Sequence, residues 1–216
     1  MRSLDYPIGD LLISKMRTLA ALLLIVVAGC SPTPPDSQSY TTQIASERAS
    51  KDEMFRSGKN SPVRPDEIGV FVPLSYFAID EAYAVPAQLQ PAAERVSAQM
   101  PTSTGKLREL ALVGSLVFTL KGQPLKLAAF MEEGSSQLFV PFSDLTSGTE
   151  TYQAGRYMNL DPSPSGIYIV DFNVAYHPYC YYNAEYDCPF PPAENRLTLP
   201  IRAGERLRKA DTMVPR

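Results

Sequence analysis

Acidic, basic, amide and imidazole side chains gather in two segments of the C-terminal half, on either side of a turn rich in Pro, Ser and Gly at residues 161–166. A tight hairpin there would pair Leu160 with Ile167. Because side chains alternate between the two faces of a strand, this register predicts that six polar residues share one face. These residues are Glu150, Tyr152, Arg156, Asp171, Asn173 and His177. The same face is apolar toward the turn, which suits a pocket for a small polar or anionic ligand.

The hairpin register places Arg156 opposite Asp171. The strand neighbours of Asp171 are apolar, and a buried carboxylate needs a partner, which a guanidinium can supply with two hydrogen bonds. A structural ion pair between strands is the simpler interpretation of this pair, and ligand binding is the other. Gly155 leaves the register open, because glycine in a strand often marks a bulge.

Catalysis is an alternative to simple binding. A hydrolase or isomerase would use Glu150 or Asp171 as its general acid or base, and His177, the only histidine, is the first candidate for a base at neutral pH. These three residues could also form a metal site, but Arg156 would compete for the carboxylates, so we expect no metal or cofactor. Fingerprints of serine hydrolases, phosphate loops and dinucleotide-binding folds are missing. A third interpretation is a purely structural envelope protein, in which the polar residues brace strands.

A second chemical feature is the cysteine pair Cys180 and Cys188, in a loop at residues 176–192 that holds five tyrosines and four prolines. In an exported protein such a pair predicts a disulfide. A zinc site that also uses His177 is the alternative, but it lacks an obvious fourth ligand and the usual spacing. A loop stiffened in this way would be either a rigid lid over the polar end of the face or a cap on an open barrel end.

The N-terminal region predicts export. A nine-residue apolar run, Leu19–Val27, follows a basic residue and precedes the small residues of a VAGC string that ends at Cys30. The run is too short to cross a membrane as a helix, and the pattern is that of a secretory signal. VAGC resembles the bacterial lipobox, so we expect cleavage before Cys30 and lipidation of that residue. Two acidic residues near the beginning do not fit a basic leader, which makes Met16 the better start.

We expect three parts along the chain. Residues 1–29 form the signal region, and residues 30–39 form a lipidated cysteine with a flexible, proline-rich tether. Residues 40–216 form a single β-rich domain with one N-terminal helix. By resemblance to lipoprotein sorting in two-membrane bacteria, Ser31 favours the cell envelope, at the outer membrane facing the periplasm. The lipid anchor at Cys30 would make the contact with the membrane.

Charge narrows the choice of partners. The formal net charge is −3 and the basic residues form no run. We therefore do not expect the protein to bind nucleic acid, or to bind anionic lipid through electrostatic attraction. A small molecule remains the expected ligand.

The domain is expected to be mainly β, an antiparallel meander closed as a barrel or a sandwich. One helix precedes the strands at Tyr40–Ser57, a stretch without Gly or Pro. The turns between the later segments are too short for parallel crossovers. The expected strands are Tyr76–Ile79, Tyr83–Leu89, Leu107–Val113, Leu116–Leu120, Leu125–Met131, Gln137–Phe142, Glu150–Leu160, Ile167–Ala175 and Leu197–Arg202.

Several strings of the C-terminal half, taken in order, resemble a known family. They include FVPFSD at 139–144, TSGTETY at 146–152, AYHPYC at 175–180 and CPFPP at 188–192. Together they resemble the bacterial family called domain of unknown function 1684, with this chain as a lipoprotein member. The resemblance implies a β-rich domain and no established reaction. The family pattern has asparagine where this chain has His177, so a reaction common to the family would not depend on that side chain.

Overall fold

The computed structural model describes residues 37–58 and 60–208, which belong to one compact unit. The predictions on the signal region, on Cys30 and on the first part of the tether lie outside these residues. Among the helices described, none is long and apolar enough to span a membrane.

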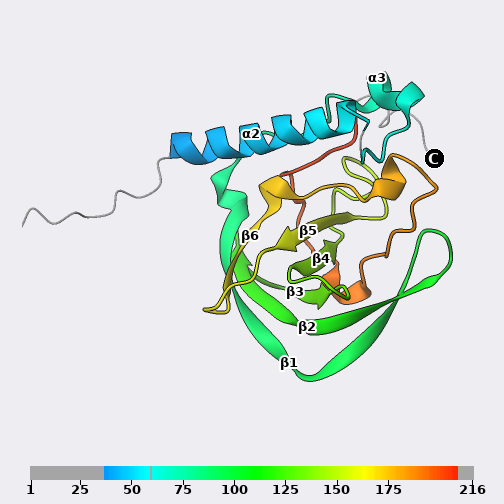
Figure 1. Cartoon of the computed structure of the whole chain (residues 1–216). Coiled ribbons are helices and arrows are strands. Elements are labelled where there is room, and N and C mark those ends of the chain that lie inside the picture. Colours follow the sequence, from blue (N-terminus) through cyan, green and yellow to red (C-terminus); the bar gives the residue numbers. More distant parts are fainter. Residues whose placement is uncertain (1–36, 59, 209–216) are drawn as a thin grey trace, which may run out of the picture. The chain divides into compact units, whose positions relative to one another are not determined.

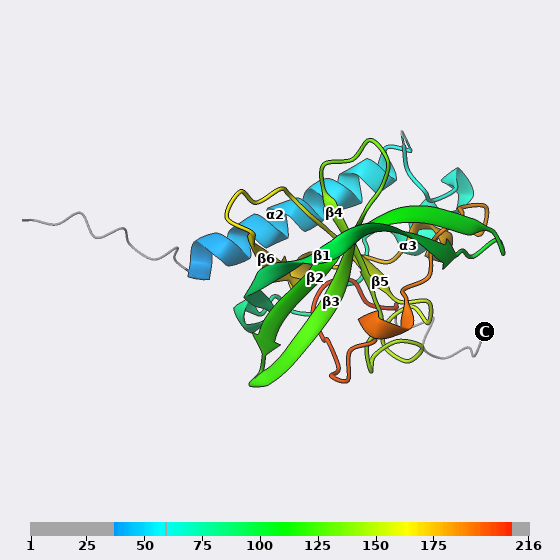
Figure 2. The ribbon, with the colours of Figure 1, turned by 90° about the horizontal axis from the view of Figure 1, so that it is seen from below.

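Six antiparallel strands form one sheet in the order β5-β4-β3-β2-β1-β6. The sheet curls into a half-barrel, in which β1 and β2 are long bent arms (Figure 1 and Figure 2). The expected antiparallel, mainly β fold is therefore confirmed, but the edge strands β5 and β6 do not pair to close a barrel. The strands are β1 (Ala84–Pro101), β2 (Leu107–Leu120), β3 (Gln123–Met131), β4 (Leu138–Phe142), β5 (Arg156–Leu160) and β6 (Ile167–Asp171).

Strand β2 joins two segments that the sequence predicts as separate strands. Gly114 lies between them, where the register with β3 shifts by a bulge. A Cβ atom at Gly114 would lie 2.2 Å from the carbonyl oxygen of Gln90 on β1. Glycine therefore lets β1 and β2 approach this closely and allows one long strand to bend through the sheet.

The prediction of a hairpin between β5 and β6 is wrong. Strand β5 pairs with β4, whereas β6 pairs with β1 at the other edge of the sheet. Within the described residues, the bridge between the two segments is at Tyr157 and Tyr176, whose reciprocal N–H to carbonyl bonds measure 2.9 and 3.0 Å. The turn at 161–166 is thus wide rather than tight. Every residue of β4 is buried, so its ladder with β5 takes precedence over a local hairpin.

Two other expected strands are loops. Tyr76–Ile79 makes a single bridge, from Tyr76 to Glu205, and Leu197–Arg202 has no strand ladder. Strands β3 and β4 also have little backbone pairing, and the side chain of Asn195 links them instead. Asn195 accepts from the N–H of Ala128 at 2.7 Å and donates to the carbonyls of Ala128 at 2.8 Å and Pro141 at 2.7 Å. It thereby joins β3 to β4, where the ladder has one pair.

Helix α2 (Ser37–Arg56) begins before the expected Tyr40 and buries Ile44 and Phe55 against the rest of the domain. Phe55 packs edge-on against Tyr182, with ring centroids 5.2 Å apart. The helix therefore covers part of the tyrosine-rich loop, as Figure 1 shows. The remaining short helices are η1 (Pro65–Glu67), α3 (Ile68–Phe71), η2 (Glu81–Tyr83), η3 (Phe172–Val174), η4 (Tyr179–Tyr181) and η5 (Ala193–Asn195).

Candidate functional site

The structure separates the six polar residues that the hairpin register brings together. Arg156 is fully buried, and its carboxylate partner is Asp144, at 2.9 Å, rather than Asp171. Glu150 lies at the surface, where Arg202 Nε donates to its two oxygens at 2.9 and 3.0 Å. The expected shared face therefore does not exist, because the β5–β6 pairing that would create it does not form.

Arg156 is the centre of a buried hydrogen-bonded cluster. Its Nη1 donates to the carbonyls of Ala203 at 2.5 Å and Glu205 at 3.1 Å, and its Nη2 donates to that of Ile201 at 2.7 Å as well as to Asp144. Burial lowers the pKa of the guanidinium, and the Asp144 carboxylate opposes that effect. The cluster fastens the C-terminal segment to the sheet. We call it the arginine brace.

Asp171 and Asn173 fasten η3 to α2. The Asp171 carboxylate accepts from the N–H of Asn173 at 2.8 Å and from the hydroxyl of Tyr40 at 2.7 Å. The Asn173 side chain accepts from the N–H of Asp80 at 3.0 Å and donates to the Asp80 carbonyl at 2.8 Å. Burial, followed by the bond to Asp171, raises the pKa of Tyr40. These two predicted site residues thus have structural partners.

His177 and Tyr152 belong to a third group, around the buried carboxylate of Glu205. Oε2 of Glu205 accepts from the backbone N–H of His177 at 2.6 Å and from the Tyr182 hydroxyl at 2.7 Å. Oε1 accepts from Lys51 Nζ at 2.6 Å. The N–H of Tyr152 donates to Nε2 of His177 at 3.3 Å, so the imidazole is held inside the domain.

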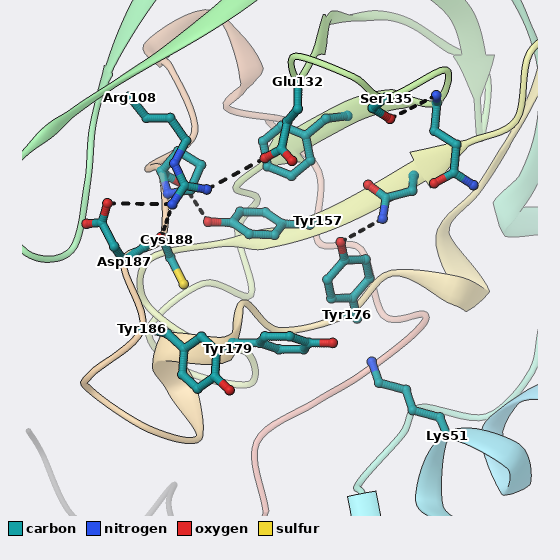
Figure 3. Close-up of a pocket in the computed structure, with 14 residues that line it drawn as sticks. Lys51, Arg108, Glu132, Ser135, Tyr157, Tyr176, Tyr179, Tyr186, Asp187 and Cys188 are labelled. Atoms are coloured by element: carbon teal, nitrogen blue, oxygen red, sulfur yellow. Dashed lines mark hydrogen bonds and ion pairs between the residues drawn. The ribbon is translucent and has the colours of Figure 1, made fainter. Parts of the chain in front are cut away.

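A cavity of about 510 Å³ opens toward solvent elsewhere in the described residues, and we call it the tyrosine pocket (Figure 3). Its walls are formed by strands β2, β4 and β5, the β3–β4 turn, helix α2 and the loop at 176–192. Its lining includes Lys51, Arg108, Glu132, Gln137, Phe139, Tyr157, Asn159, Tyr176, Tyr179, Tyr186, Asp187 and Cys188.

Four tyrosines, Tyr157, Tyr176, Tyr179 and Tyr186, line the pocket in Figure 3. Tyr157 and Tyr176 meet edge to face with ring centroids 5.8 Å apart, and Tyr179 and Tyr186 do so at 5.3 Å. Asn159 donates to the Tyr176 hydroxyl at 3.0 Å. Burial raises the pKa of Tyr176 and of Tyr179, so both hydroxyls stay protonated and can donate hydrogen bonds.

Each cation of the tyrosine pocket is paired with a carboxylate of the domain. Arg108 lies 3.6 Å from Glu132 and 3.5 Å from Asp187, and it donates to the Asp187 carbonyl. Lys51 Nζ lies over the Tyr176 ring at 4.7 Å but is paired with Glu205. The cations therefore offer little uncompensated charge to an anion. The polar groups that remain for a ligand are hydroxyls and amides, of which Tyr157 already donates to the Pro189 carbonyl at 2.5 Å and Gln137 to Asp161 at 2.8 Å.

The two cysteines lie together beside this pocket. Both are thiols in this structure, and the N–H of Cys180 donates to Sγ of Cys188 at 3.2 Å. A hydrogen bond from the Cys188 thiol lowers the pKa of Cys180 to about 7, and the same bond, with burial, raises the pKa of Cys188. The disulfide stays a prediction. Among the described residues, no group of three or more His, Cys, Asp and Glu could hold a metal ion.

Comparison with known proteins places this chain in a family. The model for proteins of unknown function DUF1684 matches residues 70–206. The chain belongs to this family. A solution structure of an uncharacterized protein from gene locus rrnAC0354 of Haloarcula marismortui is 36% identical with a TM-score of 0.64, covering 81% of this chain and 98% of that one. No curated protein matches the sequence at a significant level.

The match supports the DUF1684 resemblance but not the finer expectations attached to it. The similar structure comes from an archaeon, so bacterial origin and membership as a lipoprotein stay predictions. Within the DUF1684 region, sequence reasoning overlooks the tyrosine pocket as the site. The signal in the sequence that points to this pocket is the density of tyrosines at 176–192. From the sequence alone, this loop is expected to be a lid or a cap.

Proposed function

We propose that this DUF1684 domain binds a small, neutral, polar ligand that carries a flat ring face, in the tyrosine pocket. The observation that carries this proposal is a cavity of about 510 Å³ walled by four tyrosine rings, with its cations already paired. The volume lies in the range of about 300 to 1,000 Å³ that small-molecule sites occupy.

The lining favours a ring over an extended chain. Tyrosine presents a large apolar ring at low conformational cost and keeps a hydroxyl for hydrogen bonding. A sugar or nucleoside face could stack on these rings while Gln137 and Asn159 contact its polar groups. A free phosphate or carboxylate would have to displace Glu132 or Asp187 from Arg108, which makes an anionic ligand the weaker form of this proposal.

Binding without turnover is the form we propose. Neither Glu150 nor Asp171, the acid or base expected for a hydrolase or isomerase, lines the tyrosine pocket. Glu150 is held by Arg202, and Asp171 by Tyr40 and Asn173.

Matched ligands that differ by one phosphate test the proposal. The purified, ¹⁵N-labelled protein is titrated with uridine and uridine monophosphate, and with methyl β-D-glucopyranoside and glucose 6-phosphate. We expect the neutral member of at least one pair to shift the amide signals of Tyr176, Tyr179 and Tyr186 at lower concentration. Tyr186→Ala should abolish these shifts, whereas Phe190→Ala, an exposed residue of the same loop, should not. Shifts caused only by the phosphorylated members, or no shifts at this loop, would contradict the proposal.

We also propose that the domain is held at the outer membrane by lipid on Cys30, facing the periplasm. The apolar run and the VAGC string support this location. Labelling cells with radioactive palmitate should mark the native protein and leave Cys30→Ser unmarked. Label retained on Cys30→Ser would refute the anchor without affecting the pocket proposal.

A further inference from the structure

A second opening lies where the half-barrel fails to close. It measures about 450 Å³ and is lined by the N-terminal half of α2, the end of β5 and the whole of β6 except Val170. We call it the edge groove. It shares Asn159 with the tyrosine pocket but none of the four tyrosines of that pocket, and the role proposed for it does not rest on ligand binding there.

The backbone of β6 has an edge in this groove that is open at Ile169 but not at Ile167, whose carbonyl accepts from the Ser163 hydroxyl at 2.6 Å and whose N–H donates to the Ser165 hydroxyl at 3.2 Å. The N–H of Leu89 bonds to the carbonyl of Gly166 at 2.9 Å, which fixes the phase of the β1–β6 ladder. Bonded and non-bonded pairs alternate in an antiparallel ladder, so Ile169, opposite Pro86, turns its N–H and C=O away from β1. Pro86 has no N–H to offer, which agrees with this phase. Strand β6 has no second neighbour in the sheet.

The edge of β5 that faces the groove also has peptide groups without a neighbouring strand. Tyr157 exchanges both of its backbone hydrogen bonds with Tyr176. Asn159, two residues further on, therefore directs its N–H and C=O to the same side. Continued pairing would require an extended chain at Val174, but η3 turns the chain there. Two sheet edges thus present peptide groups to one opening.

The side chains of the edge groove have a consistent chemistry. Ile167 and Ile169 are 52% and 56% exposed, an unusual amount for neighbouring isoleucines on one strand face. The titratable groups that line the groove are Tyr40, Tyr168 and three carboxylates, those of Glu47, Asp161 and Asp171, and no lysine or arginine lines it. None of the ion pairs among the described residues includes these three carboxylates.

We propose that the edge groove docks an extended, basic segment of a partner protein, which adds a strand to the free edge of β6. Backbone pairing would supply affinity, as in other complexes formed by strand addition. Alternate side chains of the segment would lie on Ile167 and Ile169, and lysine or arginine would meet the three carboxylates. An exposed edge strand invites such pairing unless it is blocked. Ser163 and Ser165 occupy the peptide groups of Ile167, so the added strand would pair with β6 at Ile169.

The probe for this proposal is the peptide acetyl-(Lys-Val)₄-amide, added to the ¹⁵N-labelled protein. We expect shifts centred on the amides of Ile169 and Asn159. A version methylated on the backbone nitrogen of alternate residues should bind about tenfold more weakly or worse, because it cannot complete a ladder. Acetyl-(Glu-Val)₄-amide should not bind.

Variants of the groove complete the test. Glu47→Gln and Asp161→Asn should each weaken binding about two- to fivefold, and Glu133→Gln, an exposed carboxylate outside the groove, should leave it unchanged. Equal binding of the methylated peptide, or of spermine, would show a site for polycations rather than for a strand and would overturn the proposal. So would shifts confined to other parts of the domain, or none.

Discussion

The arginine brace and the tyrosine pocket contain similar residue types but use them in opposite ways. In the arginine brace, Arg156 and Asp144 direct nearly all of their hydrogen-bonding groups to the protein, and both side chains are at most 1% exposed. In the tyrosine pocket, rings and amides face a cavity. Polar residue types therefore do not by themselves distinguish a structural cluster from a binding site. What distinguishes a binding site from a structural cluster is the number of polar groups that the protein leaves available to a ligand.

The largest expected effect is in the arginine brace. Arg156→Met leaves Asp144 as a buried charge without its cation, and we expect the free energy of unfolding to fall by about 3 to 5 kcal/mol. Urea denaturation measures the change. Because the partners are in contact, Arg156→Met combined with Asp144→Asn should cost less than the two single losses added together. Additive losses would mean that the two residues do not act as a pair.

A smaller effect is expected from the cysteines. If the predicted disulfide forms in the exported protein, reduction should lower the free energy of unfolding by about 2 to 3 kcal/mol, since the bond closes a short loop. The reduced protein has its own signature, because the lowered pKa of Cys180 should make its alkylation by iodoacetamide rise through pH of about 7. Two free thiols in the unfolded, unreduced protein would refute the disulfide.

The smallest effect concerns pH and the buried carboxylate of Glu205. Burial alone would raise the pKa of Glu205, but Lys51 and His177 outweigh burial and lower it below the ordinary glutamate value. A carboxyl whose pKa is lower in the folded state stabilises the fold above the unfolded-state pKa, about 4.3, and that contribution is lost as pH falls through the folded-state value. Glu205→Gln should therefore flatten the decline of stability in acid. An unchanged acid limb would contradict this role.

The sequence predicts the fold class better than the strand pairing. Alternating apolar residues and turn signals locate part of each of the six strands, although β1 continues beyond the expected Leu89 to Pro101, and the stretch without Gly or Pro at 40–57 locates α2. Pairing depends on which edges bury the most surface, a long-range property. Strand β6 joins β1, about eighty residues earlier in the sequence, and no local pattern indicates that choice.

The error in pairing explains the error in the site. Placing Arg156 opposite Asp171 requires a hairpin that does not form, whereas its real partner, Asp144, lies in the FVPFSD string that serves in the sequence only as a family signature. Asp144 is easily overlooked because an acidic residue after a buried strand also fits a turn. The expectation that the loop at 176–192 is a lid or a cap is closer to the observed site, because Tyr176, Tyr179 and Tyr186 of this loop line the tyrosine pocket.

The tyrosine pocket, and not the arginine brace, is the region that we propose receives the ligand. Crystals of the protein soaked with a library of ring-containing fragments, both neutral and anionic, test this claim most directly. We predict that neutral fragments gather between Tyr157, Tyr176 and Tyr179, with Arg156 still bonded to Asp144. Fragments that leave this pocket empty and gather beside Arg156 or Glu150 would contradict the claim.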